Sequence, residues 1–188
     1  MGGGMTTINF ADPVHSVSHC QACPYRAYGP AIGPRGDPAS RIVIVGEAPG
    51  AQEIEQGRPF VGPAGGILKG ALNEARLDER DLFITNAVAC KPYPTPRPHV
   101  TAIEACEGLL VADLSAHPRV VVVTLGATAF RATMRRRGFR MKDVGGTAVD
   151  SPWGPLIPSL HPARIRRVPF ERHLLVTDLA RARELARR

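Results

Sequence analysis

The stretch R-I-V-I-V-G, residues 41–46, indicates the fold class because it is a short β-branched run that ends in glycine. A run that is apolar on both faces is typical of a buried strand in a parallel sheet. Residues 82–86 and 120–125 have the same character, and residues 156–160 form a weaker fourth run. The sequence therefore predicts a mostly parallel sheet of four strands.

Helical patterns separate and follow these runs. In residues 63–76 the apolar side chains recur every three to four positions, so they share one face of a helix. Residues 100–115, 127–136 and 170–187 are read as helices in the same way. Strands that alternate with helices predict an α/β fold with helices on both faces of the sheet. In such folds the ligand lies beyond the carboxyl ends of the strands.

The length and composition are those of one globular domain. A chain of 188 residues can bury a single core, and neither an internal repeat nor an interdomain linker is visible. We therefore expect residues 1–188 to form one domain, with residues 1–10 disordered or tag-like. The longest apolar runs are far too short to cross a bilayer, so no membrane segment is expected.

The charge balance points to an anionic partner. The formal net charge is +7, the isoelectric point is about 9.8, and 21 of the 24 basic residues are arginines. Arginine grips phosphate through two parallel hydrogen bonds, so nucleic acid is the first candidate partner. A GC-rich genome would explain the preference for arginine over lysine, but it would not explain the excess of positive charge.

Four cysteines form a close pair, Cys20-x2-Cys23, and two scattered positions, Cys90 and Cys106. This spacing suits four thiolates that the fold gathers around one iron–sulfur cluster, because cluster ligands can come from remote segments. Thiolates also bind zinc, so the spacing leaves the metal open. Disulfides or free thiols are a third possibility. No secretory signal is apparent, which favours a reducing compartment and counts against disulfides.

The loop after the first strand, residues 46–66, reads G-E-A-P-G-A-Q-E-I-E-Q-G-R-P-F-V-G-P-A-G-G. It matches neither a dinucleotide-binding fingerprint nor a P-loop. Gly46 would let the backbone approach a bound ligand closely. Glu47 would lie at the edge of a cleft, or be an ordinary solvated acid. Phe60, in a loop stiffened by glycine and proline, suits stacking on a planar ligand, although phenylalanine is also often buried in a core.

Two further strand ends carry polar side chains. Asn86 ends the strand at 82–86 and offers both a donor and an acceptor, which can read the edge of a base, although asparagine there also forms turns. His161 follows the last strand, but a single histidine is weak evidence of chemistry.

The residues after His161 read P-A-R-I-R-R. Arg164, Arg166 and Arg167 form a candidate phosphate clamp, or else an ordinary solvated charge run. Ile165, between them, is a candidate apolar wedge into a base stack.

At these positions the chain resembles the family 4 uracil-DNA glycosylases, the iron–sulfur branch of that superfamily. The matching pieces run in family order: C-Q-A-C-P (20–24), V-G-E-A-P-G (45–50), G-R-P-F-V-G-P-A-G (57–65), I-T-N (84–86), C-K-P (90–92), E-A-C (104–106) and S-L-H-P-A (159–163). The resemblance implies a three-layer α/β/α sandwich. It also implies a 4Fe–4S cluster on Cys20, Cys23, Cys90 and Cys106.

The resemblance also implies roles for single residues. Phe60 would stack under the uracil ring, and Asn86 would read the uracil edge. His161 would stabilise the departing base, and Glu47 would lie near the attacking water. Glu53 matches a second acid of the same loop and is expected to contribute to substrate binding.

The expected activity is that of a monofunctional DNA glycosylase, which releases uracil from a flipped-out deoxyuridine and leaves an abasic site in base excision repair. The expected partner is uracil-containing DNA. No lysine stands out as a Schiff-base nucleophile. We expect a monomer in the cytoplasm, associated with the nucleoid.

Three positions depart from the family pattern: Tyr25, Ile54 and Thr95 stand where leucine, aspartate and asparagine are usual. These departures keep open a DNA-binding damage-recognition relative with weak or altered base specificity. The sequence also leaves open an iron–sulfur electron carrier and a zinc-stabilised enzyme of the same fold.

Overall fold

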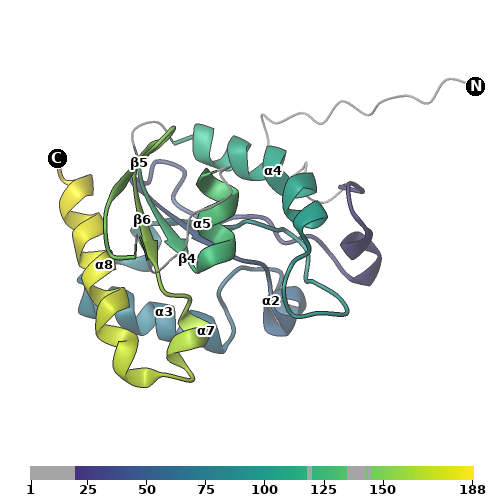
Figure 1. Ribbon diagram of the computed structural model, residues 1–188, viewed down its shortest axis with the longest axis horizontal. Coiled ribbons are helices and arrows are strands. Elements are labelled where there is room, and N and C mark those ends of the chain that lie inside the picture. Colours follow the sequence, from purple (N-terminus) through teal and green to yellow (C-terminus); the bar gives the residue numbers. More distant parts are fainter. Residues whose placement is uncertain (1–19, 118–119, 135–142, 144) are drawn as a thin grey trace, which may run out of the picture.

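The computed structural model describes residues 20–117, 120–134, 143 and 145–188 (Figure 1). Residues 1–10, expected to be disordered or tag-like, lie outside the described part. The strands are β1 (Arg35–Gly36), β2 (Ile42–Gly46), β3 (Phe83–Asn86), β4 (Val121–Leu125), β5 (Val149–Ser151) and β6 (Gly154–Ser159). The α-helices are α2 (Ala51–Gln56), α3 (Pro63–Glu74), α4 (Val100–Ser115), α5 (Ala127–Met134), α7 (Pro162–Ile165) and α8 (Arg172–Ala186). Three short 3₁₀ helices are η1 (Pro24–Tyr28), η2 (Glu79–Asp81) and η3 (Pro169–Glu171).

The strands form one sheet in the order β1-β3-β2-β4-β6-β5. The four inner strands are parallel and correspond to the four predicted runs. The predicted count of four is nevertheless too low, because β1 and β5 add short antiparallel edges. These edge strands have two and three residues, too few to show an alternating pattern in the sequence.

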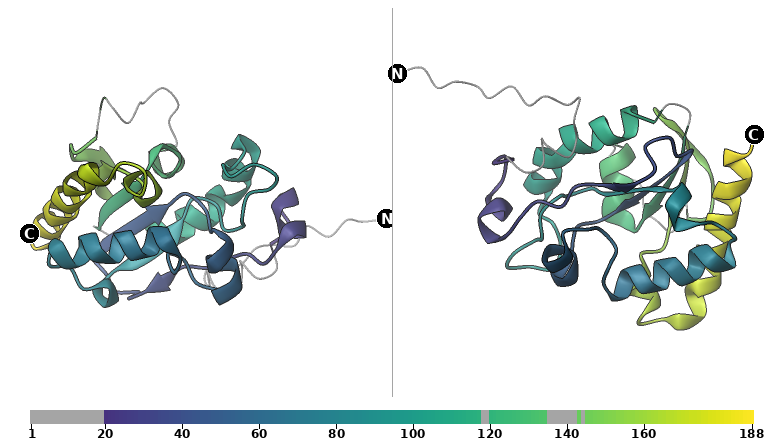
Figure 2. Two further views of the ribbon diagram at one scale, coloured as in Figure 1. Left: turned by 90° about the horizontal axis from the view of Figure 1, so that it is seen from below. Right: turned by 180° about the vertical axis from the view of Figure 1, so that it is seen from behind.

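Helices cover both faces of the sheet, which confirms the three-layer α/β/α architecture (Figures 1 and 2). Successive residues of a strand point to opposite faces, so β2 contributes to two separate cores. Ile44 packs with residues of α3 and α8 on one face. Val43 and Val45 pack with residues of α4 and α5 on the other. Every residue of β2 and β4 is buried, as expected for a sheet covered on both sides.

The predicted helix at 100–115 has the bounds of α4, and the pattern at 63–76 runs two residues beyond α3. The pattern at 170–187 divides into part of η3 followed by α8. Residues 135 and 136, predicted to end the helix that contains α5, lie outside the described residues.

The topology brings the loops with unusual composition together. Because β2, β3, β4 and β6 are parallel, the ends of these strands lie at one edge of the sheet. Gly46 pairs directly with Asn86 across β2 and β3, and the His161 segment leaves from β6 at the same edge. No helix in the described part is long and apolar enough to cross a membrane.

Candidate active site

Gly46, Asn86 and Phe60 meet at the carboxyl end of β2. A methyl group added at Gly46 would lie 2.3 Å from Asn86 Oδ1 and 2.6 Å from Cε2 and Cζ of the Phe60 ring. The two side chains therefore converge on the bare Cα of Gly46, which explains why this position carries no side chain. Phe60 and Asn86 are both only partly buried, so they line a surface that a ligand can reach.

Phe60 is held in a left-handed backbone conformation, with φ of 54°. Such a conformation costs a non-glycine residue about 1–2 kcal/mol, so the surrounding loop must enforce it. Gly65 permits it on one side, since a Cβ there would lie 2.0 Å from the Phe60 carbonyl oxygen. The surrounding loop, rather than the local backbone preference, therefore fixes where the Phe60 ring lies.

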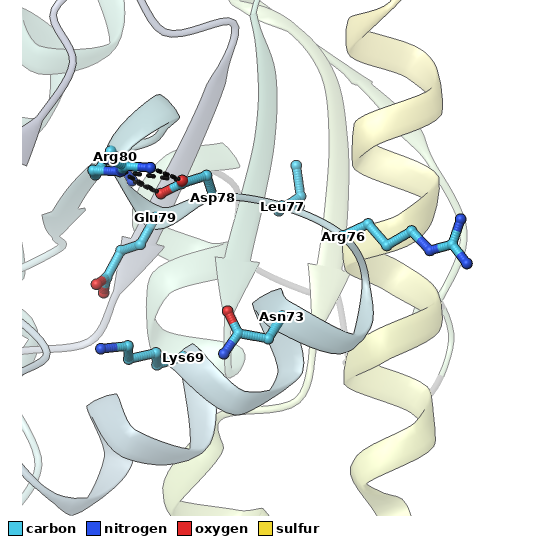
Figure 3. Close-up of a pocket in the computed structure, with 7 residues that line it drawn as sticks. All are labelled: Lys69, Asn73, Arg76, Leu77, Asp78, Glu79 and Arg80. Carbon is cyan, nitrogen blue, oxygen red and sulfur yellow. Dashed lines mark hydrogen bonds and ion pairs between the residues drawn. The ribbon is translucent and has the colours of Figure 1, made fainter.

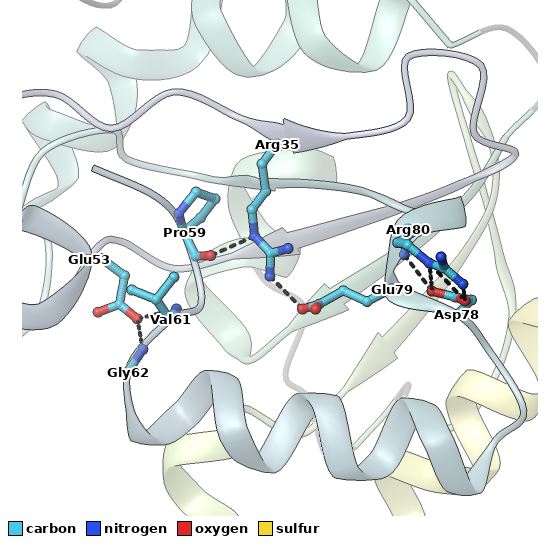
Figure 4. Close-up of polar contacts among 8 residues, drawn as sticks. All are labelled: Arg35, Glu53, Pro59, Val61, Gly62, Asp78, Glu79 and Arg80. Carbon is cyan, nitrogen blue, oxygen red and sulfur yellow. Dashed lines mark hydrogen bonds and ion pairs between the residues drawn. The ribbon is translucent and has the colours of Figure 1, made fainter. Parts of the chain in front are cut away.

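Two charged side chains hold the Phe60 loop from either side (Figure 4). The carboxylate of Glu53 is buried and accepts hydrogen bonds from the backbone N–H groups of Val61 at 3.0 Å and Gly62 at 2.8 Å. The guanidinium of Arg35 donates to the Pro59 carbonyl at 2.8 Å and forms an ion pair with Glu79. Glu53 is thus used within the loop, and Arg35 is a supporting residue that no sequence pattern indicated.

His161 faces the same space from β6. Its ring centroid lies 6.5 Å from that of Phe60. Its Nδ1 accepts a hydrogen bond from the Ala163 backbone N–H at 3.1 Å, so His161 caps the short helix α7. A neutral imidazole that accepts at Nδ1 carries its proton on Nε2. This assignment, inferred from the hydrogen bond, leaves Nε2–H available as a donor.

Burial lowers the pKa of His161 below its usual value, and the nearby charge of Glu47 opposes that shift. The imidazole is therefore neutral at pH 7, in agreement with its capping bond. Glu47 lies directly after Gly46, and its carbonyl accepts from the Val88 N–H at 3.0 Å. The structure thus brings Glu47, Phe60, Asn86 and His161 to one region.

The side chains of residues 164–167, which follow His161, have three different environments. Arg164 donates two hydrogen bonds to the Glu171 carboxylate, at 2.5 Å each, while Arg166 and Arg167 are exposed. Ile165 is only 3 % exposed and belongs to the core on the α3 and α8 side. This burial contradicts the prediction of an apolar wedge at Ile165. The reason is that α7 turns the residue four positions after His161 toward the core.

The four cysteines are free thiols that lie near one another. Cys90 and Cys106 are buried with Tyr25 in a small separate core, and Cys23 packs against it. Burial raises the pKa of Cys90 to about 12, with smaller contributions from the thiols of Cys106, Cys23 and Cys20. Three of the four thiols, those of Cys23, Cys90 and Cys106, lie in this apolar region, and soft thiol ligands are the donors that iron–sulfur clusters use. Among the described residues, no three potential ligands are grouped as a single metal ion would need.

The cavity drawn in Figure 3 has a volume of about 470 Å³ and lies elsewhere. It is lined by Lys69, Asn73, Arg76, Leu77, Asp78, Glu79 and Arg80. These residues end α3 and precede β3, so the cavity lies at the amino edge of the sheet. It is therefore separate from the strand ends that gather Phe60, Asn86 and His161.

Comparison with known proteins agrees with this arrangement. The model of the uracil DNA glycosylase superfamily matches residues 34–182, which is most of the chain. The chain belongs to the uracil DNA glycosylase superfamily. A type-4 uracil-DNA glycosylase of Pyrobaculum aerophilum is 34% identical over 87% of this chain and 88% of its own length. One of Thermotoga maritima is 34% identical over 92% of each chain. A type-5 uracil-DNA glycosylase of Thermus thermophilus is 35% identical, but over only 56% of this chain and 54% of its own.

The predicted membership of the type-4 family is therefore confirmed, and the matched region contains all four residues that meet at the strand ends. Cys20 and Cys23 lie before the region that the superfamily model matches. The longer pairwise matches to the type-4 uracil-DNA glycosylases cover about nine-tenths of the chain.

Proposed function

We propose that this member of the superfamily is a monofunctional uracil-DNA glycosylase, a hydrolase that cleaves the N-glycosidic bond of a flipped-out deoxyuridine and leaves an abasic site. The observation that carries the proposal is the convergence of Phe60, Asn86 and His161 at one sheet edge. The type-4 names of the relatives support the same substrate. A duplex hides the bond, so the nucleotide must first leave the stack, at a cost of about a few kcal/mol.

Phe60 and Asn86 would recognise the base. The Phe60 ring, fixed by its strained backbone and by the Glu53 bonds, is a stacking surface that needs no further ordering. The Asn86 amide offers an acceptor for uracil N3–H and a donor for O4. Both side chains abut Gly46, so they would contact the same base. We further propose that Glu53 and Gly46 act by positioning these two side chains.

His161 would stabilise the leaving group. When the C1′–N1 bond breaks, its electron pair stays with uracil, and negative charge develops on O2. A neutral imidazole with its proton on Nε2 can donate a hydrogen bond to that oxygen. A donor already fixed by the Ala163 bond needs no reorganisation, which is the source of its effect on rate.

Glu47 would orient the water that attacks C1′. Its negative charge raises the pKa of His161, and its backbone directly follows Gly46, the residue that pairs with Asn86. The water oxygen would bond to C1′, and its proton would pass to Glu47 or to solvent. Arg166 and Arg167 are exposed and would hold phosphates beside the extruded nucleotide, whereas Arg164 would first have to leave Glu171.

We also propose that Cys20, Cys23, Cys90 and Cys106 hold a 4Fe–4S cluster. The cluster would join η1 to the loop after β3 and to α4. Its contribution would be structural, because hydrolysis of an N-glycosidic bond needs no electron transfer. Brown colour and four irons per chain in anaerobically purified protein would support the cluster, whereas stoichiometric zinc in place of iron would exclude it.

A uracil-containing oligonucleotide, followed by alkaline cleavage at abasic sites, tests the function. We expect the protein to release uracil, and His161→Ala to reduce the single-turnover rate by about 10²-fold or more, as expected for the loss of one such donor. DNA affinity and melting temperature should stay near those of the parent protein. No uracil release by cluster-loaded protein would contradict the function, and an unchanged rate for His161→Ala would contradict the role of that histidine.

A further inference from the structure

Two exposed tyrosines stack on each other near the cysteines. The ring centroids of Tyr28 and Tyr93 are 4.4 Å apart, and the ring planes are inclined by 30°. Tyr28 is 57 % exposed and Tyr93 is 54 % exposed, so each ring keeps a large part of its surface in water. Neither belongs to the small core formed by Tyr25, Cys90 and Cys106. Packing of the fold therefore does not account for the pair.

Both rings are carried by segments that the structure holds in place. Tyr28 ends η1, where Arg26 donates to the Gly29 carbonyl at 3.0 Å. Tyr93 follows Cys90, which forms a β-bridge with Ala31. The loop that carries Tyr93 is anchored again at its end, where the His99 N–H donates to the Tyr25 hydroxyl at 2.9 Å. A partner would thus meet a preformed surface.

The two chain segments that carry the pair contribute positive charge and no negative charge. Lys91 and Arg97 flank Tyr93 and are exposed. Residues 24–36 and 87–103, which include both tyrosines, contain no aspartate or glutamate. Aromatic rings beside cations in a segment without acids form the combination that binds single-stranded nucleic acid, through base stacking and phosphate contacts.

The pair lies on the β3 side of the candidate active site. The residue after Tyr28 reaches α2, since a methyl group on Gly29 would lie 3.8 Å from Ile54 Cγ2. Helix α2 belongs to the same loop as Phe60. The exposed Arg166 and Arg167 follow α7, which leaves from β6 on the other side of β2 and β4. Figure 1 shows α7 and the loop before α4 on different sides of α2.

We propose that Tyr28 and Tyr93, with Lys91 and Arg97, form a second DNA contact that stacks an unpaired base of the strand flanking the extruded nucleotide. The proposal deepens the proposed function, because it specifies which form of DNA the enzyme prefers. An unpaired base presents its face to the tyrosines, whereas a paired base is already stacked within the duplex. The contact therefore favours single-stranded over double-stranded substrate.

Fluorescence anisotropy with uracil-free DNA tests the contact without depending on excision. Stacking on an aromatic ring is worth about 1–3 kcal/mol per base, so Tyr93→Ala should weaken binding of a single-stranded 15-mer by about 5–150-fold. Binding of the matched duplex should change by less than about threefold. Tyr93→Phe keeps the ring and should bind single strands as the parent protein does. Arg97→Ala should reduce the salt slope of single-strand binding by about one.

Iron content and melting temperature identify any variant in which the region around the cysteines no longer folds. Tyr28→Ala is a second, independent variant that disrupts the stacked pair. An unchanged single-strand affinity for both tyrosine variants would overturn the proposal and leave a protein partner as the occupant of the surface. Equal losses on single and double strands would also overturn it, because stacking of an unpaired base would not explain them. If no uracil is released while these binding differences hold, only the proposed function fails.

Discussion

Gly46→Ala is the substitution that most sharply tests how the side chains converge. The added methyl group would lie 2.3 Å from Asn86 Oδ1 and 2.6 Å from the Phe60 ring, where ordinary contact begins at 3.4 Å. The amide must therefore move by about 1.1 Å and the ring by about 0.8 Å. A misplacement of about 1 Å can reduce an enzymatic rate by about 10²-fold. The fold should lose only about 1–3 kcal/mol of unfolding free energy, as is typical of overpacking.

Single-turnover excision from a uracil-containing oligonucleotide measures the rate, and thermal unfolding measures the fold. Gly66→Ala is the matched control, because nothing lies within 4 Å of a Cβ at Gly66 and the residue is inside α3. The control should excise uracil normally and gain up to about 1 kcal/mol, since alanine favours a helix over glycine. If Gly46→Ala excises uracil within about threefold of the parent rate, the placement of Asn86 and Phe60 against Gly46 does not limit the reaction.

Three further predictions concern charge. Asn86→Asp replaces the amide donor by a carboxylate and should slow uracil excision by about 5–150-fold, while affinity for duplex DNA stays within about threefold. Equal losses of rate and affinity would count against recognition of the uracil edge by Asn86. The lowered pKa of His161 predicts that kcat/KM stays flat as pH falls from 8 through the usual titration range of histidine and declines only at more acid pH. Protonation of Nδ1 would then break the Ala163 bond, whereas a rise toward acid pH would mean that the cationic form is the active one. Burial raises the pKa of Asp113 to about 6, against the hydrogen bond from Thr85 and the charge of His117. The folded state then binds the proton more tightly than the unfolded state, so stability falls as pH rises from about 4 to above 6, by up to about 3 kcal/mol. Asp113→Asn should remove that loss of stability. The test compares the change in melting temperature between pH 5 and pH 8 in the parent protein and in the variant, and an equal change in both would contradict the prediction.

Hydrophobic periodicity was sufficient to predict the layers of the fold. The apolar runs predicted to be buried strands correspond to β2, β3, β4 and β6, and the helical pattern at 100–115 has the bounds of α4. Helix α2 was missed because its six residues lie between glycines in a segment read as a loop. The edge strands β1 and β5 were missed because each is very short and forms only by pairing with another strand, β3 or β6.

The site was predictable to the extent that parallel strands end at a common edge. That rule brings Gly46, Asn86 and His161 to the same region. The composition of its loop and the motif resemblance both indicated Phe60. Neither could show that Arg35 would reach Pro59 from a different strand, because such a contact depends on tertiary structure. Neither could show that Ile165 would be buried, since four residues of α7 are too few to show a helical period.

A crystal structure of the protein with uracil bound is the most direct measurement of the proposed base-binding site. We expect the ring to stack on Phe60, with its N3 and O4 edge on the Asn86 amide and its O2 about 3 Å from His161 Nε2. Uracil bound out of contact with any one of these three side chains would contradict the proposal that one base occupies the space between them.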